Sequence, residues 1–145
     1  MAQKTILLID DEQGFLEALE HALVGEGYRV LKATDGQEAL ELLASTQIDL
    51  VTVDIMMSPG EMLEGTVSSQ QTGVYLCKEI RRRYPRLGIF CISVVTNPET
   101  IRDIKATNAR FFRKGETPLR TVLEMVASEL SRLGQLGNKS PKRFH

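Results

Sequence analysis

The stretch Lys4-Thr5-Ile6-Leu7-Leu8-Ile9-Asp10-Asp11-Glu12 begins as an apolar run and ends in three carboxylates. A second apolar run, Ile48-Asp49-Leu50-Val51-Thr52-Val53, leads directly into Asp54. Short runs of this kind predict buried parallel strands. If the two strands are neighbours, their terminal carboxylates meet, and two unit charges about 4 Å apart repel by roughly 4 kcal/mol at an effective dielectric of about 20. Such a cluster requires a proton or a cation, so it is the strongest indication of function in the chain.

Strand-like and helix-like segments alternate around these two runs. Segments rich in β-branched or aromatic residues predict strands at 5–9, 28–33, 48–53, 89–94 and 110–113. Apolar residues at helical spacing follow each predicted strand. Five β/α pairs predict an α/β fold, with a five-stranded parallel sheet covered by helices on both faces. Ligands of such sheets bind beyond the carboxyl ends of the strands, which is where the acidic residues lie.

Local signals mark the ends of several predicted helices. Asp35, with a glutamate three residues later, is typical of a capping box. Asn97-Pro98 and Thr117-Pro118 each place a capping residue before a proline at the first helical position. Gly134 is expected to end the last helix.

The size and composition of the chain indicate one globular domain. We expect this domain to span residues 1–134, with a polar loop inserted at 58–72 and a flexible, basic tail at 135–145 that carries no output domain. A composition that is 42% hydrophobic and 26% charged is ordinary for a globular protein. The formal net charge of -1 argues against nucleic acid or an anionic membrane as a partner.

Three further features predict a cytoplasmic protein. No apolar stretch approaches the roughly 18 residues that a membrane span needs. The first strand begins so early that no signal peptide can precede it. Cys77 and Cys91 lie in apolar surroundings without metal-type spacing, so we expect reduced thiols in the core.

The acidic cluster has the chemistry of a phosphoryl acceptor. A carboxylate can attack phosphorus to form an aspartyl phosphate, provided that a divalent cation and a positive side chain neutralise the incoming oxygens. Mg²⁺ favours one or two carboxylates together with water and phosphate oxygens, and Asp10 and Asp11 offer such ligands. Lys114 and Ser93 lie at the ends of two other predicted strands and supply the cation and the hydroxyl.

This set of residues resembles the receiver domain of two-component response regulators. The resemblance covers about residues 4–133 and implies the (βα)5, flavodoxin-like, doubly wound fold. No single motif is specific to this family, but the order of the motifs along the predicted strands is. The matching positions are Ile9 to Glu12, Asp54 followed by Met57, Ser93, and Lys114 preceded by Phe111.

The resemblance implies a role for each matching residue. Asp54 would accept the phosphoryl group, while Asp10, Asp11 and Asp54 would hold Mg²⁺ together with the backbone carbonyl of Met56. Ser93 and Lys114 would bind phosphoryl oxygens. Phe111 would change rotamer when Ser93 moves.

The resemblance also implies partners. The donor would be a histidine kinase or a phosphotransfer protein, and the signal would pass to a downstream protein by contact or by phosphorelay. The receiver would be no enzyme in the usual sense, since it catalyses only its own phosphotransfer and slow autodephosphorylation. Homodimerisation through the fourth and fifth helices is left open.

Three departures from the family pattern bear on these roles. The usual proline after the methionine is displaced to Pro59, and the proline after the lysine is replaced by Gly115, which makes a cis peptide there improbable. Val94 stands at a position that is usually small. Because Met56 and Val95 are also apolar where water would approach, we expect the aspartyl phosphate to be shielded from water and long-lived.

Alternative functions remain at this stage. The main alternative is a degenerate receiver that serves only as a phosphorylation-independent binding module, although the intact acids, Ser93 and Lys114 argue against it. A Mg²⁺-dependent phosphohydrolase is disfavoured, because such enzymes place a second acid two residues after the nucleophile, where this chain has Met56. A dinucleotide-binding fold lacks its glycine motif after the first strand. Thr96 is an alternative to Ser93 as the hydroxyl donor.

Overall fold

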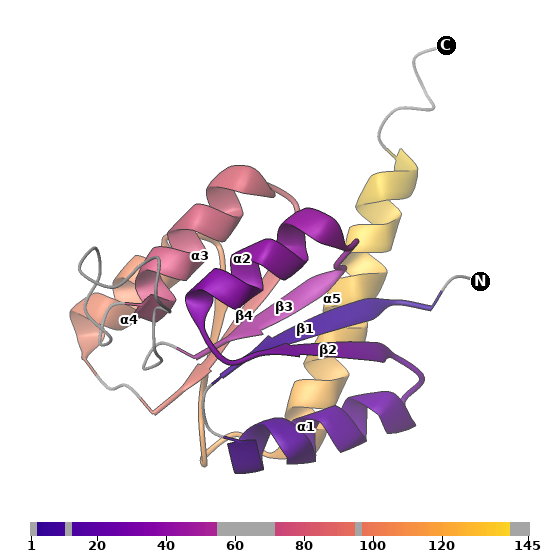
Figure 1. The fold of residues 1–145 in the computed structure, drawn as a ribbon, viewed down its shortest axis with the longest axis horizontal. Coiled ribbons are helices and arrows are strands. Elements are labelled where there is room, and N and C mark those ends of the chain that lie inside the picture. Colours follow the sequence, from indigo (N-terminus) through magenta and orange to yellow (C-terminus); the bar gives the residue numbers. More distant parts are fainter. Residues whose placement is uncertain (1–2, 11–12, 55–71, 95–96, 140–145) are drawn as a thin grey trace.

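A computed structural model describes residues 3–10, 13–54, 72–94 and 97–139 of the chain (Figure 1). Five strands form one parallel sheet in the order β2-β1-β3-β4-β5. Their bounds are β1 Thr5–Ile9, β2 Arg29–Ala33, β3 Leu50–Val53, β4 Gly88–Ser93 and β5 Arg110–Arg113. The prediction of an α/β fold with a five-stranded parallel sheet is confirmed.

One helix follows each strand, and helices cover both faces of the sheet (Figure 1). Helices α1 and α5 lie on one face, while α2, α3 and α4 lie on the other. Their bounds are α1 Gln13–Gly25, α2 Gly36–Ser45, α3 Thr72–Arg83, α4 Pro98–Lys105 and α5 Leu119–Lys139.

Alternate residues of the strands build two separate cores. In β1, Leu7 and Ile9 face the core beneath α2, α3 and α4, whereas Ile6 and Leu8 face the core beneath α1 and α5. All four side chains are at most 1% exposed. Because β1 is buried on both faces, its sequence is continuously apolar rather than alternating, as central strands of parallel sheets are.

The predicted caps of α2 and α4 are present. The Asp35 side chain accepts a hydrogen bond from the Glu38 backbone N–H at 2.8 Å, and Glu38 accepts one from the backbone of Thr34 at 3.0 Å. Asn97 caps α4 ahead of Pro98. Both caps satisfy backbone donors that have no partner within the helix.

The last helix does not end at Gly134 as predicted. Helix α5 continues to Lys139, so the first residues of the predicted tail are helical (Figure 1). A glycine in a helix interior costs only about 1 kcal/mol relative to alanine, which neighbouring turns can offset. The predicted loop at 58–72 also ends one residue early, because α3 begins at Thr72; residues 55–71 lie outside the described part of the chain.

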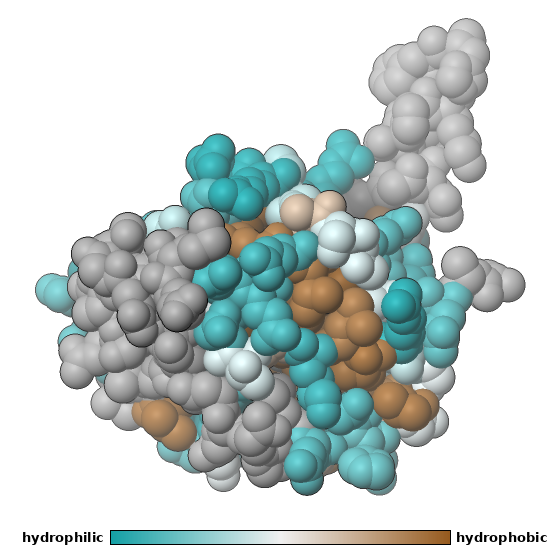
Figure 2. Space-filling model, viewed as in Figure 1, coloured by the Kyte–Doolittle hydropathy of each residue, from teal (hydrophilic) through white to brown (hydrophobic). Residues whose placement is uncertain are grey.

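Strand β2 forms one edge of the sheet. Figure 2 shows an apolar strip that crosses the visible side of the molecule, flanked by hydrophilic side chains. Within β2, Val30 and Leu31 are half-buried, while Arg29 and Lys32 are exposed. Charged side chains on an edge strand discourage pairing with another chain.

Among the described residues, no helix combines the length and hydrophobicity that crossing a bilayer requires.

Candidate functional site

Two of the predicted acids lie side by side at the carboxyl edge of the sheet. Strands β1 and β3 are neighbours, and Ile9 pairs with Val53, so the next residue of each strand, Asp10 and Asp54, occupies the same level. The Asp54 backbone N–H donates to the Ile9 carbonyl at 3.0 Å. Asp10 is 3% exposed and Asp54 is 6% exposed. Two carboxylates are therefore held together with little access to water.

The ammonium group of Lys114 lies between the two acids. Its Nζ is 2.7 Å from Asp10 Oδ2 and 3.2 Å from Asp54 Oδ2. Lys114 directly follows β5, and its backbone N–H donates to the carbonyl of Ser93 at the end of β4, at 2.9 Å. This hydrogen bond fixes the start of the lysine side chain at the same edge of the sheet. The lysine therefore supplies the positive charge that the acidic cluster requires.

The two acids stabilise the charged form of Lys114. Burial by itself lowers the pKa of Lys114, because it penalises the ammonium. The hydrogen bond to Asp10 and the negative charge of Asp54 outweigh this penalty and hold the pKa well above its usual value. The lysine is therefore a permanent cation at neutral pH, in a position to compensate negative charge on Asp54.

The predicted hydroxyl and aromatic residues lie on the two strands next to this cluster. Ser93 is the last residue of β4, is fully buried, and pairs in register with Arg113, the residue before Lys114. Phe111 on β5 is half-buried and packs against the core beneath α2, α3 and α4. The structure thus places Ser93 at the same edge of the sheet as the acids, whereas Phe111 lies two residues before the end of β5.

The remaining predicted site residues lie outside the described part of the chain. These are Asp11, Met56 and Thr96. Within the described ranges, no group of three histidine, cysteine, aspartate or glutamate side chains could hold a metal ion. Asp10 and Asp54 nevertheless present the hard carboxylate oxygens that Mg²⁺ prefers, and a magnesium site needs only one or two of these beside water and phosphate oxygens. The donor chemistry of the described residues therefore fits Mg²⁺.

Two features of the site were not predicted from the sequence. Lys114 was expected to bind a phosphoryl oxygen, and its direct hydrogen bond to Asp10 was not foreseen. The residue after it, Gly115, adopts a φ of 85°, a left-handed conformation that glycine reaches without strain. No peptide bond among the described residues is cis. The replacement of the usual proline by Gly115 is the feature of the sequence from which this backbone conformation could have been predicted.

The two cysteines are free thiols in the core, as predicted. Cys91 lies on β4, two residues before Ser93. Its hydrogen bond with Cys77, followed by its burial, raises the pKa of the Cys91 thiol well above the usual value. Both side chains are fully buried, so they serve as small apolar groups beneath the acidic cluster.

Comparisons with known proteins agree with the fold. The response regulator receiver domain matches residues 6–124 of the chain. A CheY-like receiver domain protein from Methanospirillum hungatei has a similar structure, with a TM-score of 0.80 and 19% sequence identity over 92% of this chain and 98% of that one. A two-component response regulator from Clostridium difficile has a TM-score of 0.76 and 21% identity, covering 90% of this chain and 98% of that one.

A third solved structure extends the same comparison. The signal receiver domain of an HD domain-containing protein from Pseudomonas fluorescens has a TM-score of 0.81 and 21% identity, over 96% of this chain and 95% of that one. At such identities the solved structures show the fold, while the family match identifies the class. The chain belongs to the response regulator receiver domain family of two-component signalling.

Proposed function

We propose that this receiver accepts a phosphoryl group on Asp54 from a phosphohistidine of a histidine kinase or a phosphotransfer protein. The observation that carries the proposal is the buried triad in which the Lys114 ammonium binds both Asp10, at 2.7 Å, and Asp54, at 3.2 Å. A structural ion pair needs one acid. A second acid at the same ammonium, at the ligand-binding edge of a parallel sheet, leaves excess negative charge that suits a divalent cation, and such a cation can in turn receive phosphoryl oxygens.

Asp54 is the nucleophile of the proposed transfer. One carboxylate oxygen attacks phosphorus, the bond from phosphorus to the histidine nitrogen breaks, and the imidazole leaves with the electron pair and takes a proton from solvent. The Asp54 backbone is held by its hydrogen bond to the Ile9 carbonyl, so the carboxylate is positioned before the donor arrives.

Lys114 compensates the charge that the transfer brings. Phosphorylation replaces the single negative charge of the Asp54 carboxylate by nearly two on the phosphoryl group, and it adds strong acceptor oxygens. The lysine already lies within hydrogen-bonding distance of Asp54, and its raised pKa keeps it protonated. A preorganised cation of this kind stabilises developing negative charge without reorganisation.

Asp10 and Asp54 would hold Mg²⁺ at this site, together with Asp11 and the Met56 carbonyl if these lie as the family pattern implies. The ion would neutralise phosphoryl oxygens as they approach the carboxylates. The fit rests on the two adjacent, buried carboxylates, whose mutual repulsion a divalent cation relieves.

Ser93 and Phe111 are proposed to transmit the change. Ser93 is buried at the end of β4, close to the phosphoryl acceptor along the sheet edge, and Phe111 is on the neighbouring strand. A hydroxyl drawn toward the phosphoryl group would leave space into which the half-buried phenyl ring turns. The surface formed by α4, β5 and α5 would then change, and a downstream protein would recognise it.

The intact mass of the protein after incubation with acetyl phosphate tests the proposal. We expect wild type to gain one phosphoryl group when Mg²⁺ is present and to gain none with excess chelator. Asp54→Asn should gain none in either condition, whereas Asp103→Asn, which changes an exposed aspartate of α4, should behave as wild type. A wild-type protein that gains no mass would instead indicate a phosphorylation-independent binding module, and an Asp54→Asn variant that still gains mass would show that another residue accepts the phosphoryl group.

A further inference from the structure

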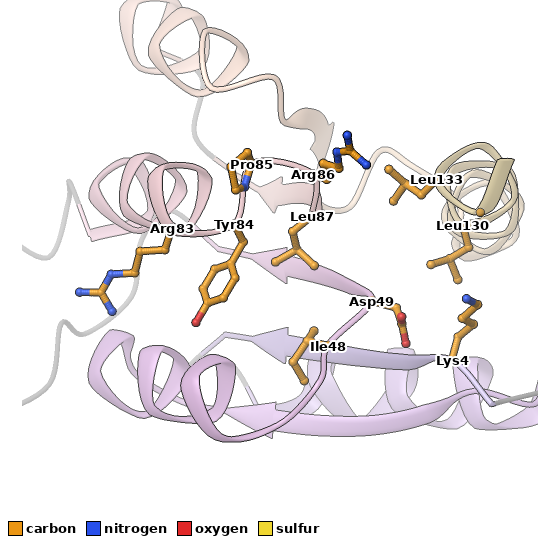
Figure 3. A pocket seen from close by; sticks show the side chains of 11 residues that line it. Lys4, Ile48, Asp49, Arg83, Tyr84, Pro85, Arg86, Leu87, Leu130 and Leu133 are labelled. Carbon is orange, nitrogen blue, oxygen red and sulfur yellow. The ribbon is translucent and has the colours of Figure 1, made fainter. Parts of the chain in front are cut away.

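A cleft lies at the amino end of the sheet, opposite the acidic cluster. It is formed where the chain enters β3, by the turn between α3 and β4, and by the C-terminal part of α5 (Figure 3). Its volume is about 720 Å³. Ligand sites of drug-sized molecules usually measure about 300–1,000 Å³, so the cleft has the size of a binding site.

The cleft combines an apolar surface with cationic side chains. Ile48, Leu87, Leu130 and Leu133 provide the apolar part. Figure 3 shows Lys4 and Arg86 beside the leucines of α5. We propose that this cleft binds a small organic anion with an apolar body, in which the body contacts the leucines and the anionic group lies near Lys4 and Arg86.

The charges that line the cleft favour an anion over a cation. Among the described residues, Lys4, Arg83 and Arg86 line it as cations and Asp49 as a carboxylate; Arg86 also takes part in another polar interaction. Arg83 forms an ion pair with Glu79 on its own helix at 2.9 Å and extends away from the leucines (Figure 3). Asp49 accepts a hydrogen bond from the Thr5 backbone N–H at 2.8 Å, which partly compensates its charge.

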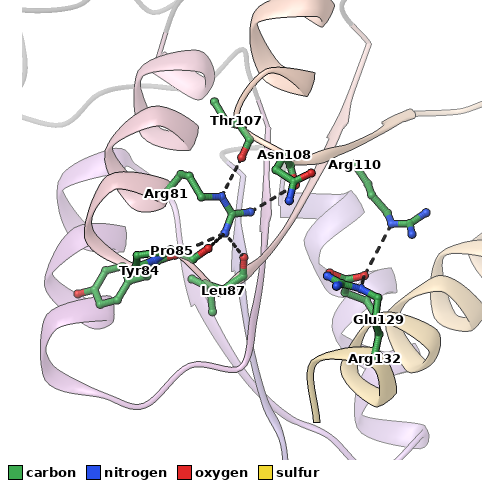
Figure 4. A network of polar contacts seen from close by, with 9 residues as sticks. All are labelled: Arg81, Tyr84, Pro85, Leu87, Thr107, Asn108, Arg110, Glu129 and Arg132. Atoms are coloured by element: carbon green, nitrogen blue, oxygen red, sulfur yellow. Dashed lines mark hydrogen bonds and ion pairs between the residues drawn. The ribbon is translucent and has the colours of Figure 1, made fainter. Parts of the chain in front are cut away.

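Arg81 holds one wall of the cleft in place from behind. Its Nη1 donates to the carbonyls of Leu87 at 2.7 Å and Pro85 at 2.9 Å, with a longer contact to Tyr84 at 3.5 Å (Figure 4). Its Nε donates to the Thr107 carbonyl at 2.8 Å, which joins this turn to the turn between α4 and β5. Because these hydrogen bonds fix the wall, ligand binding costs little conformational entropy for ordering the wall.

The opposite walls are fixed as well. The Asp49 backbone N–H donates to the Thr5 carbonyl at 2.8 Å, which anchors the entry to β3. Gly88, the first residue of β4, allows close packing with α5, since a Cβ atom at this position would lie 3.2 Å from Leu133 Cδ1 and 3.3 Å from Glu129 Cγ. The cleft is therefore largely preformed, as small-molecule sites usually are.

Titration of the full chain with 8-anilinonaphthalene-1-sulfonate, a fluorescent aromatic anion, tests this proposal. Binding would be followed by fluorescence and by amide chemical shifts of ¹⁵N-labelled protein. We expect the shifts to map to the segments 48–49, 84–88 and 130–134. Dodecanoate should displace the probe, whereas acetate, which has the charge without the apolar body, should not.

Charge variants distinguish the cleft from unspecific binding. The double variant Lys4→Gln/Arg86→Gln should bind the probe about tenfold more weakly, since each lost charge contact contributes a modest factor. Lys78→Gln, which removes an exposed cation of α3 that does not line the cleft, should bind as wild type. Native amide spectra of all variants would show that they fold.

The proposal is overturned if the double variant binds as tightly as wild type, if Lys78→Gln weakens binding equally, or if the shifts map elsewhere. Phosphoryl transfer to Asp54 does not depend on this result, because the cleft and the acidic cluster lie at opposite ends of β3.

Discussion

Lys114 donates a hydrogen bond to Asp10 at 2.7 Å across 104 residues of sequence, and this bond joins the end of β5 to the end of β1. Strands β3 and β4 lie between these two strands in the sheet. The same ammonium binds Asp54 on β3. One side chain therefore links the ends of the first, third and fifth strands at the point where the proposed chemistry takes place.

Replacing Lys114 by methionine should destabilise the folded protein. The two acids are almost fully buried, and loss of a buried partner costs about 3–5 kcal/mol, less whatever proton uptake by the acids recovers. We expect a loss of about 2–3 kcal/mol in the free energy of unfolding, measured by urea denaturation at neutral pH. Lys78→Met, at an exposed position of α3, should change it by less than about 0.5 kcal/mol. Equal effects of the two variants would argue against the triad.

Replacement of Arg81 should destabilise the folded protein more than replacement of an exposed arginine. Its guanidinium donates to carbonyls of two turns, with three distances between 2.7 and 2.9 Å (Figure 4). Arg81→Gln should lower the free energy of unfolding by about 2–4 kcal/mol, because partly buried carbonyls lose charged donors. Arg81→Lys should recover only part of this loss, since an ammonium lacks the planar fork. Arg82→Gln, an exposed neighbour, serves as the control and should cost less than about 1 kcal/mol.

Glu129 should make the stability of the protein depend on acidic pH. Hydrogen bonds from Arg132, at 2.7 and 3.2 Å, lower the pKa of Glu129 despite its burial, and the charge of Arg110 adds to the effect. A carboxyl with a lowered folded-state pKa stabilises the fold above its unfolded pKa of about 4.3, and this contribution is lost as the pH falls through the folded-state value.

Glu129→Gln should therefore reduce the free energy of unfolding by about 1–2 kcal/mol at neutral pH. The difference from wild type should shrink as the pH falls below about 4. Urea denaturation across this pH range measures both effects, with Glu124→Gln, an exposed glutamate of α5, as the control. A difference that is constant with pH would assign the effect to packing instead.

Two glycines should respond to alanine in opposite directions. Gly115 has a φ of 85° and open space around it, so Gly115→Ala should cost about 1–2 kcal/mol through backbone strain alone. Gly25, the last residue of α1, also has open space but no positive φ, so Gly25→Ala should stabilise the protein by about 0.4–1 kcal/mol. Thermal unfolding of both variants checks the pair. If Gly115→Ala were neutral, the turn after Lys114 could not require glycine.

Val94→Ala should shorten the lifetime of the proposed aspartyl phosphate. Val94 follows Ser93 directly and is 60% exposed, so its side chain lies on the surface next to the buried end of β4. A smaller side chain would open the approach of water, and we expect autodephosphorylation to accelerate several-fold. Loss of radiolabelled phosphate from the purified phosphoprotein measures the rate. Val24→Ala, which truncates a valine of α1 that is 54% exposed, should leave the rate unchanged.

The apolar runs of the sequence determined the strands and their burial. Thr5–Ile9 and Arg110–Arg113 were predicted at the bounds that the structure shows, and the other three strands to within two residues. The caps at Asp35 and Asn97 were predictable because their hydrogen bonds join residues only two or three positions apart. Asp10 and Asp54 were predicted to lie together because each directly follows a buried strand.

The tertiary structure decided the contacts between residues that are far apart in the sequence. Lys114 binds Asp10 only because β1 and β5 end at the same edge of a sheet whose strand order, β2-β1-β3-β4-β5, cannot be read from the order along the chain. In the sequence, Arg81 is one of three consecutive arginines with nothing to distinguish it from the other two. Only tertiary packing brings the carbonyls of two turns within hydrogen-bonding distance of its guanidinium. Gly134 lies inside its helix rather than at the end, because a single glycine costs only about 1 kcal/mol there and is therefore a weak stop signal. Local signals therefore specified the elements and the acids, and long-range packing specified which groups those acids meet.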